Sequence, residues 1–106
     1  MQAVRLFQGY LWHPKEAALD PRAFLPQAVQ GARLLLDEVP PPVPHFEDGT
    51  PTASQRFYQL TLLVLTEEPL EALKPQAEAV AEALQALLQD LPPGVGWLLL
   101  EDLRPL

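Results

Sequence analysis

The stretch from Leu70 to Leu91 constrains the fold of this chain most, because its apolar residues recur at spacings of three and four. That period places them on one face of an α-helix and turns the intervening acidic and amide side chains toward water. The apolar face consists of Leu70, Leu73, Ala77, Val80, Leu84, Leu87 and Leu91. The pattern predicts a long amphipathic helix that packs against another apolar surface.

Two prolines mark the start of this helix. Pro69 suits a first helical position, and the glutamates before it lie favourably near the positive end of the helix dipole. Pro75 lies further inside, where proline removes a backbone hydrogen bond at a cost of about 3 kcal/mol. We expect either a kink there or a main helix that begins at Pro75.

The same spacing also fits a coiled coil, in which paired charges usually flank the apolar core positions. Here the flanking positions are mostly small or apolar, with Ala81, Ala83 and Leu88 among them. These residues broaden the apolar face, so packing of the helix against a sheet is favoured over a coiled coil.

Strands are predicted by alternating side chains in two stretches. Gln2 to Trp12 carries large apolar residues on both faces, which is typical of a central strand. Arg56 to Thr66 has one wholly apolar face, formed by Tyr58, Leu60, Leu62 and Val64. A last strand is expected over Val95 to Leu103. A short strand over Val43 to Glu47 would lie at a sheet edge because it contains a proline, and a polar loop follows it.

A second helix is predicted over roughly Leu25 to Val39, before three consecutive prolines. Its apolar face would consist of Ala28, Val29, Ala32, Leu35, Leu36 and Val39. Gly31 weakens a helix interior by about 1 kcal/mol relative to alanine. Close contact with the sheet or with the other helix would explain this glycine.

A weak internal repeat links the two predicted helices. Pro26-Gln27-Ala28 and Pro75-Gln76-Ala77 open them, and a proline pair follows each. Each half of the chain then reads strand, helix, strand, and two such halves make the βαββαβ ferredoxin-like arrangement. We predict a single α+β domain over residues 1–106, with a four-stranded antiparallel sheet and two helices on one face.

The composition argues against several classes of function and cellular location. The net charge is −7, and the five arginines are scattered along the sequence, which argues against nucleic-acid binding. The chain has no cysteine, no apolar run near the roughly 20 residues of a membrane helix, and no signal-peptide pattern. We expect a cytoplasmic protein without metal or cofactor and without a membrane partner. Thirteen prolines and the absence of Asn and Ile are typical of thermophiles, and also of GC-rich genomes.

The predicted sheet has a second face that points away from the helices. The candidate ligand-binding residues on this face are Gln8, Tyr10, Trp12, Gln59, Thr61 and Trp97, with Phe57, Leu63 and Leu65 beside them. Monomers rarely leave so large an apolar area in water. We therefore expect a homodimer or a higher homo-oligomer, which would also accommodate a small apolar ligand.

This expected architecture resembles the dimeric α+β barrel proteins, in which small ferredoxin-like domains pair face to face and enclose a cavity. The resemblance covers the fold pattern alone, and it implies a family that includes small monooxygenases, isomerases and ligand-sensing modules. Two functions stay open: a homo-oligomeric binding or regulatory module, and a small enzyme with its pocket on the sheet face. No catalytic residue is assigned, since His13 and His45 match no metal-binding spacing and Ser54 has no neighbouring base.

Overall fold

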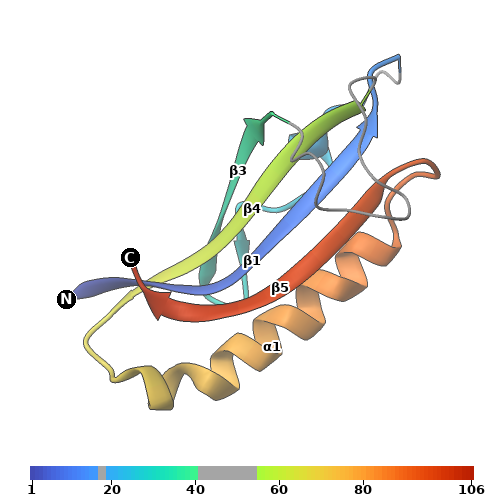
Figure 1. Cartoon of the computed structure of the whole chain (residues 1–106). Coiled ribbons are helices and arrows are strands. Elements are labelled where there is room, and N and C mark those ends of the chain that lie inside the picture. Colours follow the sequence, from blue (N-terminus) through green and yellow to red (C-terminus); the bar gives the residue numbers. More distant parts are fainter. Residues whose placement is uncertain (17–18, 41–54) are drawn as a thin grey trace.

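The computed structural model describes residues 1–16, 19–40 and 55–106. In these ranges an antiparallel sheet of five strands, in the order β2-β3-β4-β1-β5, carries one α-helix on one face (Figure 1). The strands are β1 (Gln2–Pro14), β2 (Ala28–Val29), β3 (Ala32–Val39), β4 (Gln55–Thr66) and β5 (Gly96–Pro105), with the helix α1 (Leu70–Gln89) and the short 3₁₀ helix η1 (Pro21–Ala23). The domain is therefore mostly β-structure.

The predicted ferredoxin-like fold is wrong, because residues 28–39 form the β2–β3 hairpin instead of a second helix. Gln30 and Gly31 connect the two strands with φ angles of 48° and 82°, the left-handed conformation that two-residue hairpin turns require. The Gln76 side chain of α1 donates a hydrogen bond to the Gln30 carbonyl at 3.4 Å, which ties the turn to the helix. The sheet thus has five strands, and the described residues contain a single α-helix.

The long helix forms as predicted. Pro69 is its N-cap, and α1 runs from Leu70 through Pro75 as one helix, so no separate main helix begins at Pro75. The residues that it buries against the sheet are Leu73, Ala77, Val80, Leu84 and Leu88. Leu87, which the predicted apolar face included, is exposed, and Leu88 takes its place in the core.

The core lies between α1 and the two central strands, β1 and β4. Tyr58, Leu60, Leu62 and Val64 of β4 face the helix and are buried, as the alternation in β4 predicts. The buried Pro21 and Leu25, from η1 and the segment after it, add to the covered side of the sheet. The predicted strand over Val43 to Glu47 and the loop after it lie outside the described residues, apart from Gln55, which begins β4.

In the described part of the chain, no helix combines the length and the apolar character that crossing a membrane requires.

The N-terminal and C-terminal ends of the chain lie together at one end of the sheet (Figure 1), where the Leu106 amide donates to the Ala3 carbonyl at 3.0 Å.

Candidate binding face of the sheet

The face of the sheet opposite α1, which we call the open face, is organised in rows that cross four strands. The pairing register places one residue each of β3, β4, β1 and β5 side by side in every row. In that strand order the four rows are Arg33-Leu63-Arg5-Arg104, Leu35-Thr61-Gln8-Leu100, Asp37-Gln59-Tyr10-Leu98 and Val39-Phe57-Trp12-Gly96. The face therefore changes from basic at one end, through aliphatic and polar, to aromatic at the other.

The structure brings five of the six predicted site residues together on this face: Gln8, Tyr10, Trp12, Gln59 and Thr61. Trp97 does not join them. It pairs with Leu11 of β1 and packs against the helix-side core. The run Trp97-Leu98-Leu99-Leu100 is apolar on both faces, so its alternation alone does not reveal which residues face the helix.

A β-bulge in β1 decides which residues reach the open face. The register shifts between Arg5 and Phe7, so Leu6 is an extra residue relative to β4. Val4 and Leu6 are fully buried on the helix side, whereas Gln8 and Tyr10, which simple alternation would place beside them, lie on the open face. Simple alternation through β1 fails at this point.

Hydrogen bonding and ring stacking order the middle and the aromatic end of the open face. The Gln8 amide donates to the Tyr10 hydroxyl at 2.9 Å. The Phe57 ring stacks on Tyr10 and on Trp12, with centroid distances of 5.3 and 5.6 Å. The Trp12 indole lies so close to Gly96 that an added Cβ would be 2.2 Å from its Nε1, so glycine is needed there.

The basic row contains three of the five arginines, although they are scattered in the sequence. Arg5 forms an ion pair with Asp102, and Arg104 Nε contacts the same carboxylate at 2.9 Å. Arg33, across Leu63 from Arg5, is exposed. The sequence signal for this row was the alternation Arg33, Leu35, Asp37, which becomes visible once the segment is recognised as a strand.

Large aliphatic side chains of the open face remain in contact with water. The exposed fractions are 36% for Leu35, 67% for Leu65 and 42% for Leu100. Leu63 and Leu98 are half-buried. Leu63 adjoins Leu35 and Leu65, and Leu98 adjoins Leu100, so the face carries two groups of leucines with Thr61 and Gln8 between them. Exposed apolar groups of this kind mark interaction sites.

His13 lies on the other side of the sheet and is fully buried. Its Nδ1 donates to the Pro14 carbonyl at 2.9 Å, because a carbonyl can only accept. This leaves Nε2 to accept a hydrogen bond from the Tyr58 hydroxyl at 3.1 Å. Burial raises the pKa of Tyr58, which keeps this hydroxyl protonated. The pair is thus a satisfied element of the core, away from the open face.

An ion pair lies beside Tyr58. Arg56 donates to both carboxylate oxygens of Glu38, from Nε at 2.9 Å and from Nη2 at 2.7 Å. The hydrogen bond from Arg56 lowers the pKa of Glu38, and the carboxylate in turn raises the pKa of Arg56. Within the described ranges, no three His, Cys, Asp or Glu side chains are grouped as metal ligands.

These features define a small, mostly β domain with one helix, whose second sheet face is aliphatic and carries arginines at one end. The chain belongs to the family described as "Protein of unknown function (DUF3208)", whose model matches residues 1–106. A comparison with curated proteins gives no match.

Proposed function

We propose that this protein is a homo-oligomeric binding module in which the open face of one copy packs on the open face of a second copy. The observation that carries the proposal is the patch of exposed leucines, with Leu35, Leu65 and Leu100 contributed by β3, β4 and β5. Burying each such side chain contributes roughly 1.5–3 kcal/mol before the costs of association.

The size of the face is compatible with a specific dimer. Four rows about 6.8 Å apart on four strands about 4.8 Å apart give a footprint of about 20 by 14 Å between the outermost Cα atoms. With the side chains at its borders, a pair of such faces buries on the order of 1,000 Å², which is the lower bound for a specific interface.

The order of the rows supports one particular geometry. A two-fold axis that lies between the two sheets and runs across the strands, over the Leu35 row, places the basic row opposite the Asp37 row of the second copy. It places the aromatic row opposite the Leu65–Ala3 pair, which lies beyond the basic row. The Leu35 row then meets its own equivalent, and Arg33 of each copy lies over Asp37 of the other. The alternative axis, along the strands, would bring the basic row against itself, which like-charge repulsion opposes.

A small apolar ligand is the second part of the proposal. Gln8, Gln59 and Thr61 are polar groups among apolar neighbours, and buried amides and hydroxyls need hydrogen-bond partners. In the seam they would bond either to the second copy or to a ligand that lies near Tyr10 and Trp12. Native mass spectrometry of the purified protein tests this part, because a bound molecule adds a defined mass to the oligomer. A spectrum that contains the bare oligomer alone contradicts it.

The alternative of a small enzyme of the dimeric α+β barrel kind depended on the ferredoxin-like fold. The described residues form a five-stranded sheet with a single α-helix, which removes that basis, so this alternative is not proposed.

The dimer is tested by placing a charge in the seam. Leu100→Glu should convert the dimer to a monomer in sedimentation velocity at micromolar concentration, because the axis over the Leu35 row places the two new carboxylates against one another in the seam. Ala79→Glu, on the exposed side of α1, adds the same charge away from the seam and should leave the dimer intact. A wild-type protein that sediments as a monomer would contradict the proposal.

The geometry is tested by exchanging charges. R33D and D37R should each weaken the dimer, since each places like charges opposite one another, and the double variant should restore it. Failure of the double variant to restore association, with both single variants folded, would exclude this axis.

A further inference from the structure

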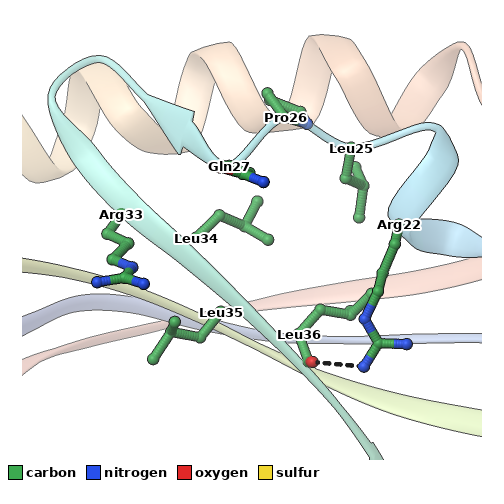
Figure 2. Close-up of a pocket in the computed structure, with 8 residues that line it drawn as sticks. All are labelled: Arg22, Leu25, Pro26, Gln27, Arg33, Leu34, Leu35 and Leu36. Carbon is green, nitrogen blue, oxygen red and sulfur yellow. Dashed lines mark hydrogen bonds between the residues drawn. The ribbon is translucent and has the colours of Figure 1, made fainter.

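A hollow of about 300 Å³ lies beside β3, at the edge of the sheet, and adjoins the proposed dimer seam at Arg33 and Leu35 (Figure 2). It is lined by Arg22, Leu25, Pro26, Gln27, Arg33, Leu34, Leu35 and Leu36. β2 pairs with β3 at Ala28–Val29, and the chain before it diverges from β3 toward η1, which opens the hollow between them.

The outer edge of β3 offers backbone groups to this hollow. Residues 34 and 36 direct their amide and carbonyl groups away from β4, because alternate residues of an antiparallel strand bond to opposite neighbours. The Leu34 amide donates to the Gln27 carbonyl at 2.9 Å, and the Leu36 carbonyl accepts from Arg22 Nη2 at 3.2 Å. No backbone group of the described residues is bonded to the Leu36 amide on this edge.

Arg22 is held in position at this edge. Its backbone amide donates to Asp20 Oδ1 at 3.1 Å, which caps η1, and its side chain reaches across to β3 (Figure 2). One guanidinium nitrogen is used by the Leu36 carbonyl, and guanidinium has five N–H donors. The Leu36 carbonyl is thus occupied by Arg22, whereas the amide of the same residue and the remaining guanidinium donors are left for a ligand.

Charge and wall composition specify the ligand. Two of the five arginines line the hollow, and none of its described lining residues is acidic, although the chain as a whole carries −7. The walls between the arginines are formed by Leu25, Leu34 and Leu35. The volume is at the lower end of ligand pockets, which suits a molecule of a few heavy atoms.

We propose that this hollow binds the carboxylate of a small aliphatic molecule. The carboxylate accepts hydrogen bonds from the Arg22 guanidinium and the Leu36 amide, and the aliphatic part packs against the leucine walls. Arg33, at the other end of the hollow, adds positive charge but does not donate to the carboxylate. The same chemistry is offered by a free short-chain acid and by the C-terminal carboxylate of a peptide that ends in an aliphatic residue.

Titrations of the full-length protein with hexanoate and with hexylamine, followed by amide and methyl NMR, test the proposal. Hexanoate should shift the Leu36 amide and the Leu25 and Leu34 methyl signals saturably, and hexylamine should not. Arg22→Gln should weaken hexanoate binding at least tenfold. Lys74→Gln removes the same charge from the exposed side of α1, away from the hollow and the seam, and should change the affinity less than twofold.

A second pair of probes separates the two sources of the carboxylate. N-acetyl-Ala-Leu with a free C-terminus should bind at least tenfold more tightly than hexanoate if the natural ligand is a peptide end, and its C-terminal amide should not bind. Tighter binding of hexanoate assigns the site to free acids. The proposal is overturned if no carboxylate gives saturable shifts, if hexylamine binds as well, or if K74Q weakens binding as much as R22Q.

The Arg22→Gln variant also keeps this test separate from that of the dimer. Arg22 is not part of the rows of the open face, so the variant should retain wild-type sedimentation whether or not the hollow binds an acid. Unchanged dispersion of its methyl signals shows that it folds.

Discussion

The two faces of the sheet are made by the same strands, yet they have opposite environments. Leu60 and Leu62 of β4 are fully buried under α1, whereas Leu65, on the alternate face of the same strand, is 67% exposed. Both faces are rich in leucine, so residue type does not distinguish them. At the aromatic end of the open face Phe57 is also buried, with 1% exposure, so the contrast applies to the rest of β4. There the position of α1, not the hydrophobicity of the strand, decides which side of this sheet becomes the core of the monomer.

The largest expected effect comes from truncating neighbouring residues on the two faces. Leu60→Ala should lower the free energy of unfolding by about 2–5 kcal/mol, because it leaves a cavity under α1. Thr61→Ala, on the open face, should change it by about 0.5 kcal/mol or less in the monomer. Urea denaturation of both variants in the L100E background measures this difference without a contribution from association. Equal losses would contradict the assignment of the core to one face.

Adding one methyl group to a glycine on each face should give the next largest effect. In Gly9→Ala the new Cβ would lie 2.9 Å from the Leu98 carbonyl oxygen, so backbone must move, at a cost of about 1–3 kcal/mol. In Gly96→Ala it would meet the Trp12 side chain. We expect a smaller loss of stability there and a shift in tryptophan fluorescence, since the indole is displaced. A G96A emission spectrum identical to wild type would contradict the contact.

Removing one tyrosine hydroxyl from each face compares the stability contributed by a buried polar group with that of a water-accessible one. Tyr58→Phe should cost about 1–3 kcal/mol at neutral pH, because His13 Nε2 is left buried without a donor. Tyr10→Phe should cost less, since Gln8 is only partly buried and can bond to water. Thermal denaturation at pH 7 compares the two.

The ionisation of Tyr58 should make the stability of the protein depend on pH. The folded pKa of Tyr58 lies above its ordinary value of 10.0, so on alkalinisation the unfolded chain loses this proton first. Stability should therefore be unaffected below about pH 9 and should fall as the pH rises past 10. The fall should be shallower in Y58F than in the wild type. An unchanged slope would contradict a buried hydroxyl.

The smallest expected effect concerns the exposed ion pair at the sheet edge. The pKa of Glu38 is lower in the folded chain than its ordinary value of 4.5, so its pairing with Arg56 favours folding above that pH and is lost as the pH falls through the folded pKa. Glu38→Gln should lower stability slightly at pH 7, and the loss should diminish as the pH falls below 4.5. Glu78→Gln, on the exposed side of α1, serves as the matched control in the same denaturation series.

Two segments with similar sequences show how much of the secondary structure the spacing of apolar residues alone predicts. Pro75-Gln76-Ala77 lies in a helix, and Pro26-Gln27-Ala28 leads into a β-hairpin. The first segment is followed by about three helical turns of consistent spacing, and local periodicity of that length determined α1. The second is shorter, and its apolar residues fit either structure. The positive φ at Gly31 and the pairing with β4 favoured the hairpin.

The sequence by itself determined the helix, the two central strands and the residues of β4 that face away from α1, because each depends on a local period of side chains. It did not determine the bulge at Leu6, the orientation of Trp97, the row of arginines or the hollow beside β3. Each of these depends on register between strands that are distant in the chain. Register is set by backbone hydrogen bonds and packing across the whole sheet, and these interactions exist only in the folded protein.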